Sequence, residues 1–109
     1  MREARIILPG YQRNGAPVDS RVLSRLEAMI IDAFGGFTCM RGIRAYRMND
    51  GTLKQEPVAI FDIAIKQVSF RSISLHDIAL WVANAANQEC VYLRHPNGSV
   101  EFVSGASMD

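Results

Sequence analysis

The spacing of apolar residues along the chain predicts two amphipathic helices. After Asp19, apolar side chains recur every three or four residues, which places them on one side of a helix. Asp19 is suited to cap the start of this helix, and the Gly35-Gly36 pair supplies the left-handed backbone that commonly ends one. A second helix begins with the capping-box pattern Ser74-Leu75-His76-Asp77. We therefore expect helices over residues 20–34 and 75–87.

The segments outside the helices have the short apolar runs and turn residues of β-strands. Asn49-Asp50-Gly51 and His95-Pro96-Asn97-Gly98 are typical of tight turns between antiparallel strands. Gly42 interrupts the alternation of its segment, so we expect a bulge or bend there. The expected strands cover residues 4–8, 37–48, 58–66, 90–94 and 99–103.

The order of these elements is β–α–β–β–α–β with an extra terminal strand, which is the ferredoxin-like order. It predicts an α+β two-layer sandwich, an antiparallel sheet with both helices on one face and an extra C-terminal hairpin strand. The 109 residues suit a single domain. We expect that domain to span residues 1–109, with a core over 4–103 and a flexible tail over 104–109.

Composition and charge narrow the possible partners. The chain is 49% hydrophobic and has a net charge of +1. A net charge this small produces no overall electrostatic attraction to nucleic acid. No apolar run approaches the ~18 residues of a membrane span, and we expect no membrane association. Residues 1–47 hold eight arginines and four acids, whereas residues 48–109 hold four basic and seven acidic residues. The positive charge of the first half therefore comes from arginine alone, which suits planar contacts with carboxylate or phosphate.

The residues that most often carry chemistry are few. The two histidines and two cysteines do not occur at metal-binding spacing, and no phosphate-binding glycine motif is present. We therefore expect no metal site and no cofactor. Cys39 and Cys90 lie in apolar segments, so we interpret them as buried, inert free thiols. Asp62 is the one acid inside an apolar strand and needs a partner, for which a cross-strand arginine such as Arg44 is the expected choice.

The sheet face without helices is the expected contact surface. Tyrosine and arginine are frequent anchors of protein interfaces, and the strand over residues 41–47 is rich in both. An exposed apolar sheet face would also be buried by a homodimer. The residues that we expect to bind a partner are Arg41, Arg44, Tyr46, Arg47 and Tyr92.

Two alternatives use overlapping parts of the chain. The same arginine- and tyrosine-bearing strand could bind single-stranded nucleic acid, although the aromatic run of ferredoxin-like RNA-binding domains is absent. The other alternative is a small dimeric enzyme or ligand sensor, with a pocket between helix and sheet near Asp62 and Tyr46.

Several segments resemble a group of small proteins of phages and prophages. The similarity lies in LPGYQRNGAPV, in a helix ending AFGGFT, in MNDGTLKQEPVAIFDIAI and in NQECVYLRHPNGSVEFV, and covers about residues 5–103. These motifs are mostly turns and core positions, and no catalytic residues carry over from the group. The resemblance implies a phage or mobile-element protein acting in the cytoplasm of a bacterial host.

These inferences lead to a non-enzymatic protein-binding module as the expected function. Its expected partner is a host or phage protein, which it would bind and inhibit in the manner of an anti-CRISPR or other host-defence inhibitor. That step rests on association with mobile DNA, since a fold does not determine a function.

Overall fold

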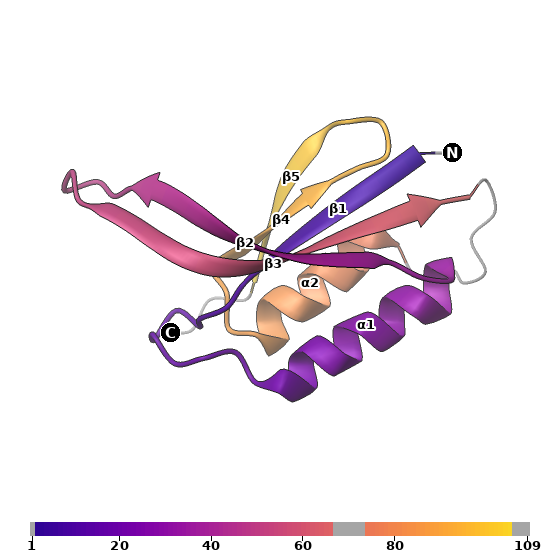
Figure 1. The fold of residues 1–109 in the computed structure, drawn as a ribbon, viewed down its shortest axis with the longest axis horizontal. Coiled ribbons are helices and arrows are strands. Elements are labelled where there is room, and N and C mark those ends of the chain that lie inside the picture. The colour runs from indigo at the N-terminus through magenta and orange to yellow at the C-terminus, as the bar shows by residue number, and fades with distance from the viewer. Residues whose placement is uncertain (1, 67–73, 106–109) are drawn as a thin grey trace.

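The computed structural model describes residues 2–66 and 74–105, and it confirms the ferredoxin-like α+β fold. All neighbouring strands are antiparallel, in the order β2-β3-β1-β4-β5 across the sheet. Both helices cover one face, and the other face has no helix over it (Figure 1). The elements are β1 (Arg2–Pro9), α1 (Ser20–Phe34), β2 (Thr38–Arg47), β3 (Leu53–Ile65), α2 (Leu75–Ala85), β4 (Cys90–Arg94) and β5 (Val100–Ser104).

The helix boundaries follow from local capping. The Asp19 carboxylate accepts a hydrogen bond from the Arg21 backbone N–H at 2.9 Å, which satisfies a donor that the first turn leaves unpaired. Gly35 ends α1 with a φ of 92°, as predicted. The Ser74 hydroxyl accepts from the Asp77 N–H in the same way at the start of α2. Both helices therefore begin where the sequence pattern placed them.

The core lies between the helices and the inward side of the sheet. Successive residues of a strand point to opposite faces, so every second side chain of β1 and β3 enters the core. The fully buried members of the two strands include Ala4, Ile6, Phe61 and Ile63. This face holds the helices in place and leaves the opposite residues of each strand on the helix-free face, which we call the open face.

The β2–β3 hairpin is longer than the sequence pattern indicated. The prediction began the second strand of this pair at residue 58, but β3 begins at Leu53. The β1–β3 ladder ends at Pro9 and Val58, so earlier residues of β3 pair with β2 alone. This part of the hairpin, residues 43–57, is called the arm here, and it projects well beyond the body of the sheet (Figure 1).

Two further details differ from expectation. Gly42 forms no bulge, because β2 and β3 pair in unbroken register through Gly42 and Val58. A Cβ on Gly42 would lie 3.1 Å from Cδ1 of Ile60, so the glycine allows close packing across the strands. The expected tail over 104–109 starts too early, because Ser104 pairs with Cys90 as the last residue of β5. Residues 106–109 lie outside the described residues.

Candidate functional site

A cleft of about 600 Å³ opens where the arm leaves the body of the sheet. Four segments that are far apart in the sequence meet there: the loop after β1, the arm, the junction between α2 and β4, and β5. We call it the arm cleft. Its lining residues are Tyr11, Gln12, Arg13, Arg44, Ala45, Tyr46, Met48, Lys54, Glu56, Gln88, Glu89, Cys90 and Phe102.

Strand pairing positions the charged residues on the arm side of the cleft. Arg44 and Glu56 lie directly opposite each other in the β2–β3 ladder, and their side chains form an ion pair. Glu56 is only 7% exposed, although it lies beyond the end of the β1 ladder. A buried carboxylate needs a charged or hydrogen-bonded partner. Arg44 supplies it, so the arm presents a paired charge to the cleft.

Arg44 also contacts an aromatic ring. Its guanidinium carbon lies 4.9 Å from the centre of the Tyr46 ring, within the range of a cation–π interaction. The Nε atom of Arg44 is buried and has no hydrogen-bond partner among the residues that the structure describes. Glu56, Arg44 and Tyr46 therefore form a compact group of carboxylate, cation and ring on the open face of the arm.

The opposite wall is held together by Gln88. Its side-chain amide is buried and donates to the backbone oxygen of Tyr11 at 2.8 Å, which ties the loop after β1 to the end of α2. Gly105 lies against the same junction, and a Cβ there would be 2.8 Å from the backbone oxygen of Gln88. This wall is therefore closely packed, and a side chain at position 105 would push it apart.

The cleft combines aromatic surface with charges of both signs. Tyr11, Tyr46 and Phe102 are partly exposed, and the Phe102 ring packs edge-on against Tyr92 at a centroid distance of 5.9 Å. Ligand sites are usually concave and largely apolar, with a few polar groups that fix orientation. The arm cleft fits a flat ligand that carries charged groups.

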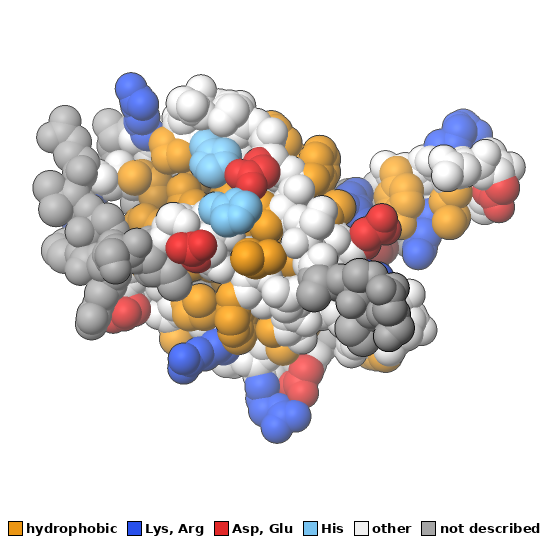
Figure 2. Space-filling view, turned by 180° about the vertical axis from the view of Figure 1, so that it is seen from behind, with side chains coloured by type: hydrophobic (Ala, Val, Ile, Leu, Met, Phe, Trp, Pro, Cys, Tyr) orange, Lys and Arg blue, Asp and Glu red, His pale blue; other side chains and the backbone are white. Residues whose placement is uncertain are grey.

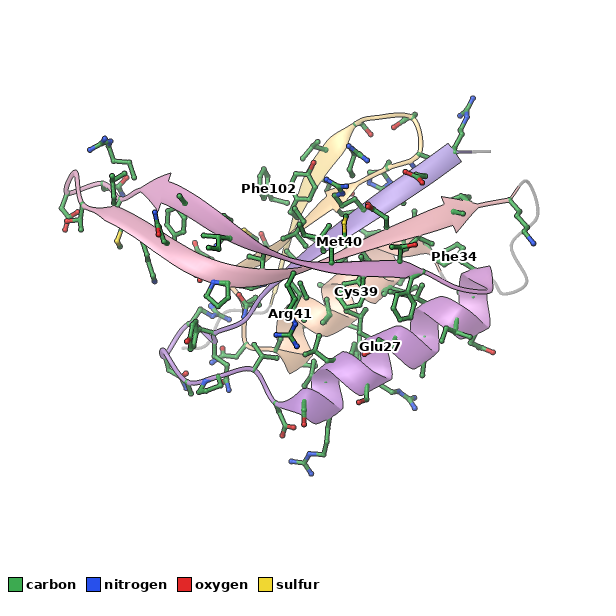
Figure 3. All side chains as sticks on the ribbon, viewed as in Figure 1. Glu27, Phe34, Cys39, Met40, Arg41 and Phe102 are labelled. Atoms are coloured by element: carbon green, nitrogen blue, oxygen red, sulfur yellow. The ribbon has the colours of Figure 1, made fainter. Side chains whose placement is uncertain are left out.

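The predicted partner-binding residues do not share one surface. Arg44 and Tyr46 line the arm cleft, and Tyr92 lies on the same open face, paired with Phe102 in the β4–β5 ladder. The side chains of Arg41 and Arg47 point to the opposite face of β2, because successive residues of a strand point to opposite faces. Figure 3 shows Arg41 and Cys39 directed toward α1, whereas Met40 and Phe102 lie on the open face. Binding of nucleic acid, and a homodimer through the open face, stay predictions.

The structure does not bring Asp62 and Tyr46 together, as the pocket expected near them requires. Tyr46 lines the arm cleft. Asp62 instead lies opposite Thr38 of β2, which is eight residues before Tyr46, so Asp62 and Tyr46 are roughly 26 Å apart along the sheet. The expected Asp62–Arg44 pair is also wrong. Arg5 on β1 binds both carboxylate oxygens of Asp62, at 2.7 and 2.9 Å. Antiparallel pairing of β1 with β3 makes Arg5 the directly opposite residue.

This ion pair predicts a dependence of stability on pH. Hydrogen bonding from Arg5 lowers the pKa of Asp62, against the opposing effect of its burial. A lowered folded-state pKa gives stability that is present above the unfolded value of about 3.9 and is lost as the pH falls through the folded value. We expect Asp62→Asn to lower the free energy of unfolding by about 1–2 kcal/mol at pH 7. In urea titrations, this difference should shrink below about pH 4, and a difference that persists at pH 2 would contradict the assignment.

The cysteines differ from the expectation of buried thiols. Cys39 is exposed and Cys90 half-buried, and both are free. Partial burial and the nearby Glu27 raise the pKa of the Cys39 thiol, against the opposing charge of Arg41. A raised pKa disfavours the reactive thiolate at neutral pH. Cys39 is therefore accessible but not activated as a nucleophile.

A His–Glu–His cluster lies outside the arm cleft. The Glu101 carboxylate contacts Nδ1 of His76 at 2.5 Å and Nε2 of His95 at 2.8 Å, and these hydrogen bonds lower the pKa of Glu101. Figure 2 shows the two histidines beside an acidic side chain, with the arm projecting to the other side. Within residues 2–66 and 74–105, no group of three or more His, Cys, Asp or Glu side chains is arranged to hold a metal ion. The cluster joins the β4–β5 hairpin to the first turn of α2.

Comparison with known proteins supplies a structural likeness. No protein-family model matches the chain, and no curated protein does. The chain is similar to a solved phage SAM lyase in complex with S-methyl-5′-thioadenosine, with a TM-score of 0.66, 14% identity and coverage of 94% of this chain and 88% of that one. It is also similar to a phage SAM lyase in the apo state, with a TM-score of 0.64, 14% identity and coverage of 98% and 91%.

These likenesses show the fold and contradict the expected function. The matched proteins are enzymes, whereas the sequence led to a non-enzymatic inhibitor of a host or defence protein. That expectation rested on association with mobile DNA, and it took the arginine-rich strand as the contact surface. The structure instead divides its residues between two faces and uses Arg44 and Tyr46 to line a cleft.

No helix among residues 2–66 and 74–105 is long and apolar enough to cross a membrane.

Proposed function

We propose that this chain is a small enzyme that binds S-adenosylmethionine in the arm cleft and cleaves it to S-methyl-5′-thioadenosine. The observation that carries the proposal is the buried Glu56 carboxylate in a cleft of about 600 Å³, where it pairs with Arg44, whose guanidinium lies over the Tyr46 ring. The similarity in fold to phage SAM lyase supports the choice of substrate. The chemistry of the lining residues is the independent support, since fold alone does not determine function.

The groups of S-adenosylmethionine have suitable counterparts in the cleft. Its purine is planar and can stack on Tyr11 or Phe102, which are both partly exposed. Its sulfonium is a cation, and aromatic faces and carboxylates attract cations. Its carboxylate suits the cationic side chain of Lys54. A cleft of this volume is within the range that binds ligands of this size.

The proposed reaction needs neither water nor a cofactor. The bond between sulfur and the carbon chain of the amino acid breaks, and its electron pair stays on sulfur, which becomes a neutral thioether. The carbon chain then either closes on its own carboxylate oxygen or loses a proton from the neighbouring carbon. Glu56 is the candidate base for the second route, and in either route it can orient the sulfonium. Because S-adenosylmethionine is a cytosolic metabolite, we place this activity in the cytoplasm.

The test is to incubate the purified chain with S-adenosylmethionine and to follow the products by liquid chromatography and mass spectrometry. We expect S-methyl-5′-thioadenosine to form at a rate that saturates with substrate and exceeds a protein-free blank. The blank is essential because the sulfonium also decomposes slowly in buffer. The two possible four-carbon products are isomers of equal mass, so their retention on the column, compared with authentic standards, separates lactone closure from proton loss. A rate equal to that of the blank would overturn the proposal.

A further inference from the structure

The arm cleft holds a cation of the chain itself on its carboxylate and its ring. Arg44 is ion-paired with the buried Glu56, and its guanidinium lies over Tyr46. A positively charged substrate would be attracted to the same two groups. The protein therefore places one of its own side chains where the positive charge of a ligand would be most stable.

We propose that Arg44 occupies a cation subsite formed by Glu56 and Tyr46, and that the positive charge of the substrate displaces it. The inference rests on the proposed function, because it concerns the same cleft and the same class of ligand. It adds a step of exchange: Arg44 leaves the subsite when a cationic nucleoside binds and returns when the ligand becomes neutral.

Burial explains why the subsite needs an occupant. The Glu56 side chain is 8% exposed, and an unpaired carboxylate at that depth would be strongly destabilised. Without a ligand, a resident cation must therefore neutralise it. Two cations cannot share the site, since like charges in contact repel each other. Binding of a cationic ligand and the resident position of Arg44 are thus mutually exclusive.

Arg44 is also suited to leave. Its side chain is 39% exposed, so the guanidinium has a route to solvent that does not pass through the core. Its Nε donor is buried without a partner among the residues described, and an unsatisfied buried donor destabilises the resident position. Rotation outward gives this donor access to water. The ion pair with Glu56 therefore holds Arg44 in this position, while its Nε–H group lacks a hydrogen-bond acceptor among the described residues.

Exchange predicts discrimination between substrate and product. A sulfonium or ammonium compound can replace Arg44 on Glu56, whereas a neutral thioether cannot. Breaking the carbon–sulfur bond removes the positive charge of the nucleoside. Arg44 can then return to the carboxylate, after Glu56 has released to solvent any proton taken in the second route. Return of the side chain would then favour release of the thioadenosine.

Nuclear magnetic resonance of the arginine Nε–H groups tests this exchange in the unaltered chain. The probes are sinefungin, a cationic analogue in which an amine-bearing carbon replaces the sulfonium, and neutral S-methyl-5′-thioadenosine. The Arg44 signal is assigned by its loss in Arg44→Lys. We expect sinefungin to shift this signal and S-methyl-5′-thioadenosine to leave it in place. Binding of both ligands with the signal unmoved, or moved equally by both, would overturn the inference alone. If neither ligand binds, the proposed function fails with it.

Calorimetry on two variants gives a second measurement. Arg44→Gln removes the resident cation, so sinefungin should bind at least fivefold more tightly while S-methyl-5′-thioadenosine binding changes less than twofold. The double variant Arg44→Gln with Glu56→Gln leaves no buried charge, so it guards against loss of folding in the single variant. In this double variant, sinefungin should no longer bind more tightly than it does to the unaltered chain. Weaker sinefungin binding in folded Arg44→Gln would show that Arg44 holds the ligand, and would overturn the inference.

Discussion

Replacing Glu56 with glutamine is expected to lower the rate of S-adenosylmethionine cleavage about a hundredfold or more. The substitution keeps the size of the side chain and its capacity for hydrogen bonding, but it removes the negative charge. Glu56 is the buried carboxylate of the arm cleft, so its charge acts in a poorly hydrated site where electrostatic effects are large. Initial rates of S-methyl-5′-thioadenosine formation, measured at several substrate concentrations, would separate slower chemistry from weaker binding.

Two matched substitutions serve as controls for this prediction. Glu89→Gln removes a second, exposed carboxylate of the cleft and should reduce the rate much less. Glu3→Gln removes an exposed carboxylate at the far end of the sheet, where the backbone of Glu3 pairs with Ala64 of β3, and it should leave the rate unchanged. A Glu56→Gln rate within threefold of the unaltered chain would remove Glu56 from the proposed site. An equal loss in all three variants would indicate a general effect of charge.

The parts of the fold that were predicted correctly depend on local signals. Asp19 and Ser74 cap their helices through hydrogen bonds to residues two or three positions away, so a short window of sequence contains the whole interaction. Gly35 is required by its left-handed backbone, which is also a local property. The order of helices and strands then led to the sheet topology.

The second strand of the arm was missed because its strand signal is not local. Residues 53–57 are mostly polar and end in a proline, which argues against a strand when taken alone. They form part of β3 because β2 pairs with them across the hairpin turn. The length of a two-stranded arm is therefore set by pairing between segments, which a single pass along the chain does not reveal.

The candidate site was missed for a related reason. Tyr11, Glu56, Gln88 and Phe102 are spread over most of the chain and meet only because β1 lies at the centre of the sheet and β5 adds beyond β4. The available signal was Glu56 directly before Pro57, an acid in a segment that resembled the phage proteins. Nothing in that signal indicated that the carboxylate would be buried.

The arginine-rich strand illustrates how composition can mislead. Arg41, Arg44 and Arg47 are close in sequence, but their odd spacing of three places Arg44 on the opposite face from the other two. Arg44 is neutralised by Glu56, and Arg47 donates to the backbone oxygen of Gly51 at 2.9 Å. A strand with several arginines is therefore not the same as a basic surface, and this difference explains why the expected contact residues do not lie on one face.

The largest expected effect on stability comes from the centre of the core. Phe61 is 1% exposed and packs edge-on against Phe37, with ring centroids 5.5 Å apart. Phe61→Ala removes this buried ring and leaves a cavity, so we expect the free energy of unfolding to fall by about 3–5 kcal/mol. For a domain of this size the melting temperature should drop by roughly 15 °C or more. Urea titration and thermal melting followed by circular dichroism would measure both quantities.

Phe102→Ala is the matched control, because it removes the same ring from the open face. Phe102 is 61% exposed, so its truncation should lower the free energy of unfolding by less than about 1 kcal/mol. It also lines the arm cleft, and its loss should weaken binding of S-methyl-5′-thioadenosine. The two substitutions thus separate stability from ligand binding with one change of side chain. A Phe102→Ala variant as unstable as Phe61→Ala would mean that another part of the molecule covers the open face.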